Sequence, residues 1–348
     1  MVTIKDIAKE LGIAPSTVSM ALNDRKGISP ELRLKVKEAA KRFGYMPYIK
    51  ARQNGMYRKT PRVISIIYPK CDTHITESVQ CGIDKVIKES DYHKIRYTVD
   101  LYSELNAEKD KERFIETILE NTAAGAIILF SITLSETTVA KLTKKGVHLV
   151  FLNTYMEYGN CVYVNNLNAS YKATKSLIEL GYNKIGIIIP DQSMGIEWND
   201  RLEGYKKALK DSNIEFNPDY IVYENDFSTL RSAAYSTKYL IEKHPEINAI
   251  LYGSDIFAFG GLKILKEMGK KIPDDIAIIG FDDMPIDEVL QPSLSSVRFP
   301  LIKMGELGAK MLLNSIMKNN FNPERIVLNE AEIILRGTCI KEYNRRWL

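Results

Sequence analysis

Six short apolar runs, each followed by an amphipathic stretch, constrain the fold of this 348-residue chain more than any other feature. The runs are rich in β-branched residues, as expected for strands covered on both faces of a parallel sheet. They lie at 62–69, 125–131, 147–153, 184–190, 248–254 and 276–283. Apolar residues recur at helical spacing in the stretches 77–89, 109–120, 169–180, 201–212, 230–243 and 257–268. The alternation predicts a doubly wound α/β body, and because one compact sheet would not hold so many units, we expect two lobes.

The first 23 residues have a different pattern, which predicts two short helices joined by a tight turn. Thr3 can cap the first helix, and Gly12 lets the chain leave that helix abruptly. Pro15 suits the first position of the second helix. An apolar stripe on that helix leaves other side chains facing outward, namely Ser16, Thr17, Ser19 and Met20. This is the pattern of a helix-turn-helix, whose second helix enters the DNA major groove, although an ordinary helical hairpin has a similar turn.

A third helix and a basic segment follow. Ser29 caps the helix, Pro30 opens it and Gly44 stops it. The segment between Pro47 and Pro61 has the composition of a plain linker, and it is equally consistent with a segment that folds only against DNA.

The charge of the chain is divided unevenly along its length. Residues 1–60 hold 13 Lys and Arg against 5 Asp and Glu, whereas the remaining residues hold 35 against 39. A basic head on a mildly acidic body suits a head that meets phosphates. The four cysteines and four histidines are dispersed, and we find no phosphate-binding loop, nucleophile elbow or cluster with catalytic spacing. We therefore expect no enzyme, no metal and no cofactor, and, without an apolar signal or membrane segment, a cytoplasmic protein.

In this order and spacing, the motifs of the chain resemble the lactose-repressor/galactose-repressor family of bacterial transcription regulators. They are TIKDIAKELGIAPSTVSMALN, SPELRLKVKEAAKRFGYMP, SLIELGYNKIGII, RLEGY, GSDIFAFG, IPDDIAIIGFDD and QPSLSSV. The resemblance implies a head that reads double-stranded operator DNA as a homodimer and a body of periplasmic-binding-protein type that senses a small molecule. The head would span residues 1–46, the hinge 47–61 and the body 62–340. Within the body, the first lobe would comprise 62–163 and 292–324, and the second lobe 164–291 and 325–340.

The resemblance also implies which residues meet DNA, and two positions depart from the family. Pro15, Ser16 and Met20 would face bases, but the family has arginine where Met20 stands, so we expect a different operator at the bases that Met20 faces. The alternative is that Met20 only packs against the head. The hinge slot that holds a minor-groove leucine in the family is Asn54 here; either Met56 takes that role through a shifted register, or the protein bends DNA less. The full set of predicted DNA-binding residues is Thr3, Pro15, Ser16, Thr17, Ser19, Met20, Asn23, Arg52, Asn54 and Met56.

For the body, the resemblance implies a pocket whose Arg201 grips the ligand, while Asp282 accepts from its hydroxyl or amine groups and Phe227 stacks on it. Asn153, Trp198 and Ser254 complete the predicted set. Simpler roles stay open: a salt bridge for Arg201, a turn cap for Asp282 and loop packing for Phe227. The set suits a sugar or related polyol, and a purine or nucleoside also fits. A small-molecule binding protein without a regulatory role is the competing function.

Overall fold

The computed structural model describes residues 4–22, 27–42, 63–69, 73–99, 108–130, 132–191, 195–224 and 230–341. Its N-terminal part is a three-helix unit of α1 (Ile4–Leu11), α2 (Pro15–Leu22) and α3 (Pro30–Arg42), as the sequence predicted. Gly12 has a φ of +64°, the left-handed conformation that ends α1. Ser29 Oγ accepts a hydrogen bond from Leu32 N at 3.2 Å and so caps α3. The core of this unit consists of Ile7, Ala8, Val18, Ala21, Val36, Ala39 and Ala40.

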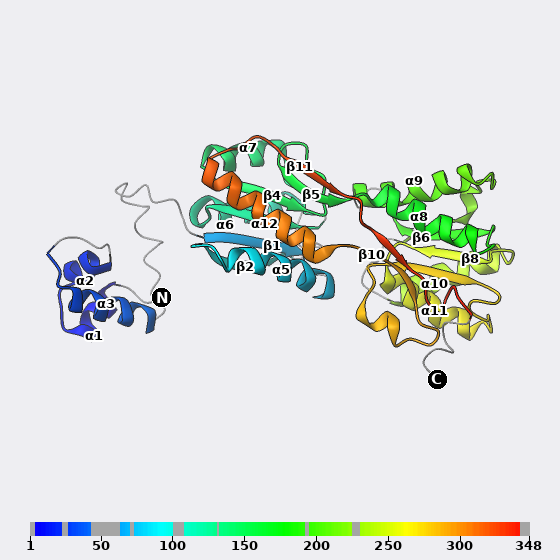
Figure 1. The fold of residues 1–348 in the computed structure, drawn as a ribbon, viewed down its shortest axis with the longest axis horizontal. Coiled ribbons are helices and arrows are strands. Elements are labelled where there is room, and N and C mark those ends of the chain that lie inside the picture. Colours follow the sequence, from blue (N-terminus) through cyan, green and yellow to red (C-terminus); the bar gives the residue numbers. More distant parts are fainter. Residues whose placement is uncertain are drawn as a thin grey trace.

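The first lobe is built on a parallel six-stranded sheet in the order β11-β5-β4-β3-β1-β2 (Figure 1). Its strands are β1 (Val63–Pro69), β2 (His93–Val99), β3 (Gly125–Leu129), β4 (His148–Leu152), β5 (Asn160–Val164) and β11 (Arg325–Leu328). Its helices are α5 (Thr73–Ile87), α6 (Glu108–Thr122), α7 (Glu136–Lys144) and α12 (Leu301–Lys318). Every residue of β3 and β4 is buried, because apolar side chains on both faces of these central strands are covered by helices.

The second lobe repeats this plan with a sheet in the order β12-β10-β9-β8-β6-β7, in which only β12 is antiparallel to its neighbour. Its strands are β6 (Ile185–Pro190), β7 (Ile221–Glu224), β8 (Ala249–Tyr252), β9 (Ala277–Phe281), β10 (Ser295–Arg298) and β12 (Glu332–Ile334). The helices are α8 (Asn166–Glu179), α9 (Ile196–Asp211), α10 (Leu230–Lys243) and α11 (Asp255–Glu267), with short 3-10 turns at Pro218–Tyr220 and Pro285–Glu288. The predicted architecture of two doubly wound lobes is confirmed.

The chain passes between the lobes after β5, after β10 and after β11 (Figure 1). Asn165 in the first crossing donates a hydrogen bond from Nδ2 to Asn329 Oδ1 in the third, at 2.8 Å. These crossings correct the predicted lobe boundaries. The stretch 292–324 does not lie wholly in the first lobe, because β10 pairs with β9 in the second sheet. Nor does 325–340 lie wholly in the second, because β11 pairs with β5. Both strands are only four residues long, so their sequences did not reveal which sheet they join.

Each lobe contains a pair of helices whose backbones approach closely at a glycine. In the first lobe, a Cβ on Gly305 of α12 would lie 2.1 Å from the carbonyl oxygen of Val79 in α5. In the second, a Cβ on Gly204 of α9 would lie 2.2 Å from the carbonyl oxygen of Leu167 in α8. Real Cβ atoms do not approach a carbonyl oxygen so closely, so only glycine fits at either position without a shift of the helices.

Candidate functional site

The start of α2 is the surface where the sequence predicted base contacts. Pro15 and Ser16 are exposed, and Thr17, Ser19 and Met20 are half-buried. The opposite side of α2 is fixed by Val18 and Ala21, which are fully buried among the helices of the head. The apolar stripe therefore anchors α2 and leaves its N-terminal end at the surface, the end that a helix-turn-helix presents to base edges.

Met20 also has a packing role within the head. A Cβ on Gly27, in the turn before α3, would lie 3.8 Å from Met20 Cε, so the end of this side chain rests beside that turn. The alternative that Met20 packs against the head therefore gains support, without removing its partly exposed surface. Five other predicted DNA-binding residues lie outside the described residues: Thr3, Asn23, Arg52, Asn54 and Met56.

In the second lobe, four of the predicted ligand-binding residues gather beside the carboxyl ends of β8 and β9. Ser254 follows β8, Asp282 follows β9, and Trp198 and Arg201 lie in the first two turns of α9. Ser254 Oγ accepts a hydrogen bond from Phe257 N at 3.4 Å, which gives it a second role as the N-cap of α11. In doubly wound folds, ligands bind outside the carboxyl ends of the strands, which is where these residues lie.

Arg201 is the centre of this group, and its side chain is enclosed. The residue is 3% exposed, its Nε donates to Asn166 Oδ1 at 2.9 Å, and its Nη1 donates to the carbonyl oxygen of Gly253. Three aromatic rings surround the guanidinium, with centroids 4.3, 4.7 and 5.4 Å from Cζ in Phe281, Trp198 and Phe299. These contacts fix the plane of the guanidinium, and the two hydrogen bonds use two of its five N–H donors.

The charges around Arg201 are mostly negative. Burial lowers the pKa of its guanidinium, and the carboxylates of Asp282, Glu197 and Asp255 act in the opposite direction. Glu197 and Asp255 are themselves buried. The site thus holds one buried cation among several acidic groups, an arrangement that favours the charged form of the arginine and does not favour an added anion.

Sequence reasoning missed two residues that the structure places beside Arg201. Asn166 opens α8 directly after the first crossing, and Phe299 lies in the second crossing. Arg201 therefore contacts the second crossing and the residue that directly follows the first. An asparagine at a helix start and a phenylalanine before a proline carry no signal of such a role, because both types are common there for local reasons.

On the first-lobe side, Asn153 follows β4 with a φ of +57°, and its buried Oδ1 accepts no hydrogen bond from the described residues. Tyr163 of β5, which the sequence did not single out, is half-buried and packs edge-on against Tyr155, with ring centroids 5.7 Å apart. Burial raises the pKa of Tyr163, and the charge of Asp200 in α9 contributes to that rise. Phe227 lies outside the described residues.

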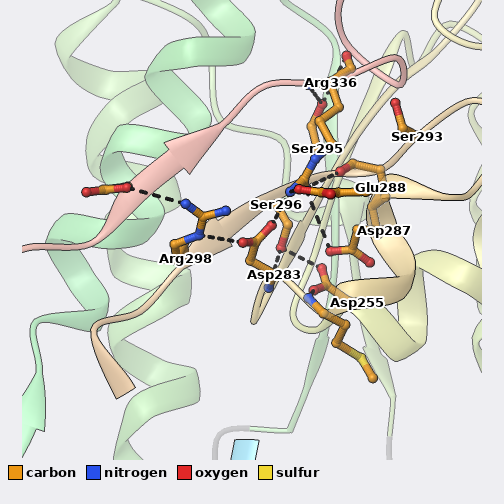
Figure 2. A network of polar contacts seen from close by, with 12 residues as sticks. Asp255, Asp283, Asp287, Glu288, Ser293, Ser295, Ser296, Arg298 and Arg336 are labelled. Atoms are coloured by element: carbon orange, nitrogen blue, oxygen red, sulfur yellow. Dashed lines mark hydrogen bonds and ion pairs between the residues drawn. The ribbon is translucent and has the colours of Figure 1, made fainter. Parts of the chain in front are cut away.

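Asp283, the residue after Asp282, belongs to a network of polar and ionic groups that are mostly buried (Figure 2). The carboxylate of Asp283 contacts Arg336 Nη2 at 2.7 Å and Arg298 Nε at 2.5 Å. Asp255 Oδ1 accepts from Ser296 Oγ at 2.7 Å. Arg336 also donates from Nη1 to the carbonyl oxygen of Leu294 at 2.8 Å. The network ties the loop after β9 to β10 and to the segment after β12.

Two carboxyl groups of this network, those of Asp255 and Asp287, are completely buried. Burial raises the pKa of Asp287 to about 7. Burial and the charge of Asp287 raise the pKa of Asp255 well above its ordinary value. Two carboxyls in one buried site do not both ionise readily, so the pair holds a proton near neutral pH.

Two surface cavities, of about 370 and 470 Å³, are lined by residues other than the predicted ligand-binding set. The first opens beside the start of β6 and the end of α9, and the second beside α5. Within the described ranges, no group of three or more histidine, cysteine or acidic side chains is arranged to hold a metal ion. None of the described helices combines the length and apolar character needed to cross a membrane.

Two protein-family models match different parts of this chain. Residues 3–48 match the model of bacterial regulatory proteins of the lacI family, and residues 174–339 match the periplasmic binding protein-like domain. The ribose operon repressor of Halalkalibacterium halodurans is 28% identical over 340 residues, which is 97% of each chain. The solved complex of the regulator CelR with cellobiose shares the fold, with a TM-score of 0.71 and 23% identity over 97% of this chain and 100% of that chain. The lac repressor dimer bound to operator and the anti-inducer ONPF has a TM-score of 0.74 and 19% identity over 97% and 99% of the two chains.

Proposed function

The chain belongs to the lactose-repressor/galactose-repressor family of ligand-responsive, DNA-binding transcriptional regulators, and from this premise we propose that it is a repressor. It would bind a pseudo-palindromic operator as a homodimer and be switched by a sugar or related polyol. The observation that carries the ligand part is Arg201, a buried guanidinium held among three aromatic rings where ligands of this fold class bind. The protein would act in the cytoplasm, where its DNA lies.

The charges of the site support a neutral polyhydroxy effector. Hydroxyl groups both donate and accept, so a polyol would donate to a carboxylate such as Asp282 and accept from Arg201. Its apolar ring face would stack on an aromatic wall such as Trp198. An anionic effector would meet the carboxylates of Asp282 and Glu197 as well as Arg201. The relatives support a sugar too, since one is a ribose operon repressor and another was solved with cellobiose.

The head supports operator binding by a dimer. Residues 1–60 carry a net charge of +8, and the exposed start of α2 is placed for base contacts. Two-fold symmetric half-sites call for a two-fold symmetric protein, and the solved lac repressor relative is a dimer on its operator.

Gel retardation tests the DNA-binding part. We expect the full-length protein to retard DNA taken from upstream of its own gene, with an affinity that falls steeply as salt rises because phosphate contacts release counterions. Absence of retardation on this DNA at low salt would contradict the proposed function.

Thermal stability tests the effector part. A panel of D-ribose, cellobiose, other sugars, polyols and nucleosides should contain a compound that raises Tm, because a ligand that binds only the native state stabilises it. In Arg201→Gln we expect binding to weaken by about 10- to 100-fold, the equivalent of losing hydrogen bonds to a charged group. Arg113→Gln, an exposed position on α6, is the matched control. If the effector raised the Tm of Arg201→Gln as much as that of the wild type, Arg201 would not be part of the site. If only nucleosides raised Tm, the effector would be a nucleoside and not a sugar.

A further inference from the structure

Asp282 and Asp283 both adopt backbone conformations that are rare for residues with a side chain. The φ of Asp282 is +109° and that of Asp283 is +50°. Residues in such sparsely populated regions persist only where the surrounding structure holds them, and they concentrate at functional sites. The question for this loop is therefore what holds it.

Three successive amides of the loop are pinned by hydrogen bonds. Asp282 N donates to the carbonyl oxygen of Val297 at 2.9 Å. Asp283 N donates to Ser296 Oγ at 3.0 Å, and Met284 N donates to Asp255 Oδ2 at 3.1 Å. The backbone is thus fixed from β10 on one side and from the start of α11 on the other.

The side chain of Asp283 adds a charged clamp to these bonds. Its carboxylate is 7% exposed and lies between Arg336, which is buried, and Arg298, which is half-exposed (Figure 2). Arg298 is the last residue of β10 before the second crossing. Its Nη1 lies 3.9 Å from an oxygen of Glu332, the first residue of β12 after the third crossing. Asp283 therefore joins the loop that presents Asp282 to the segments that carry the chain between lobes.

We propose that Asp283 is a positioning residue for the effector response: its carboxylate holds Asp282 toward the pocket and couples that loop to the second and third crossings through Arg298. Asp283 itself does not touch the effector. The effector part of this inference rests on the proposed function, whereas the clamp on the loop does not. A movement at the ends of these crossings would reach the loop through the contacts of Arg298 with Asp283 and Glu332.

Amide hydrogen exchange of the full-length protein without any added small molecule tests the clamp. In Asp283→Asn and in Arg298→Gln, we expect the peptide covering 282–290 to exchange at least tenfold faster, while β3 and β4 in the first lobe keep their wild-type rates. Arg298→Gln changes a half-exposed side chain, so it remains informative if Asp283→Asn folds poorly. Glu267→Gln, which removes an exposed ion pair with Lys263 on α11, is the matched control. Unchanged exchange of 282–290 in both variants would overturn the inference.

The response to the small-molecule probe and the affinity for the operator, measured separately, distinguish a positioning role of Asp283 from a merely structural one. With D-ribose and cellobiose as probes, the concentration that half-maximally changes operator retention should rise at least tenfold in Arg298→Gln. Operator affinity without a probe should stay within twofold of wild type. An equal loss of both affinities would overturn the positioning role. If the wild type never retards DNA, the proposed function fails, and the exchange experiment still decides whether Asp283 clamps the loop.

Discussion

The two lobes share one architecture but bury different chemistry. Among the described residues, every buried aspartate, glutamate and arginine lies in the second lobe: Glu197, Arg201, Glu224, Asp255, Asp287 and Arg336. The buried polar side chains of the first lobe are neutral hydroxyls and amides together with His148, whose pKa is lowered by burial. Buried charges contribute little to stability unless they are fully paired. The first lobe therefore acts as an apolar frame, whereas the second lobe accepts costly buried charges, three of them (Glu197, Arg201 and Asp255) at the proposed effector site.

Among substitutions that test the role of the buried charges in the second lobe, we expect Arg336→Met to lower stability most. Loss of this cation would remove a buried ion-pair partner from Asp283, at 2.7 Å, and from Asp287, at 4.0 Å. Breaking a buried pair on one side costs about 3–5 kcal/mol in the free energy of unfolding. Urea denaturation followed by circular dichroism measures it.

The control for Arg336→Met is Arg298→Met, since the Arg298 side chain is 47% exposed and also pairs with Asp283. We expect it to cost less than about 1 kcal/mol. Equal losses for the two variants would contradict the view that the buried charges of the second lobe depend on mutual pairing.

The two lobes are alike in how their helices pack, so substitutions at the packing glycines should destabilise both lobes. Gly305→Ala and Gly204→Ala each force a Cβ against a backbone carbonyl, and we expect each to cost about 1–3 kcal/mol through overpacking. Lys310→Ala and Lys210→Ala, at exposed positions of the same helices, should change stability little. A large loss in one lobe and none in the other would show that the helix pairs are not equivalent.

A smaller effect is expected from the acid pair of the second lobe. Asp287 keeps its proton up to about pH 7 in the folded state, whereas an unfolded aspartate releases it near pH ~3.9. The folded state therefore binds more protons between these values, and stability falls as pH rises through this window. Asp287→Asn should remove that part of the decline, as seen by comparing urea midpoints at several pH values.

The exposed variant Asp219→Asn serves as the control for this titration. If stability fell with rising pH as steeply in Asp287→Asn as in the wild type, another titrating group would cause that fall.

The smallest effect is expected from His148 in the first lobe, and its sign is opposite. Burial lowers the pKa of this histidine, whose Nδ1 lies 2.7 Å from Ser315 Oγ and whose ring stacks on Phe321. An unfolded histidine, with a pKa near ~6.5, then binds more protons than the folded one, so its contribution is present above that pH and is lost as pH falls. His148→Gln should flatten the acid limb of the stability profile, and His93→Gln, on the exposed edge strand, should not.

Most of the fold could be predicted from the sequence because the central strands carry an unmistakable pattern. The six apolar runs became β1, β3, β4, β6, β8 and β9, and α10 has the predicted bounds of 230–243. The strands that were missed lie at or near the sheet edges or contain polar residues. In β2, for example, every residue from His93 to Thr98 is exposed or half-buried. A strand covered on one face only lacks the continuous apolar run by which buried strands are recognised.

The residues proposed for the site could be singled out from the sequence only where they lie close to the end of a strand. Ser254 and Asp282 lie at the ends of two of the apolar runs, and Trp198 and Arg201 lie in the first two turns of the helix that follows another. The partners of Arg201, by contrast, come from distant parts of the chain: Asn166 is 35 residues away and Gly253 is 52 residues away. The clamp of Asp283 likewise depends on the pairing of β10 with β12, which no local pattern encodes. The sequence carries no local sign of contacts that exist only after the sheets have formed.

The place of β11 has a consequence for synthesis on the ribosome. This strand, residues 325–328, completes the edge of a sheet whose other five strands end at residue 164, and β12 completes the second sheet directly after it. Neither lobe of a nascent chain is whole until these late segments have emerged. A polypeptide released before that point would expose the edge of β5 as a template for another chain, so premature termination yields an aggregation-prone fragment and not a working half.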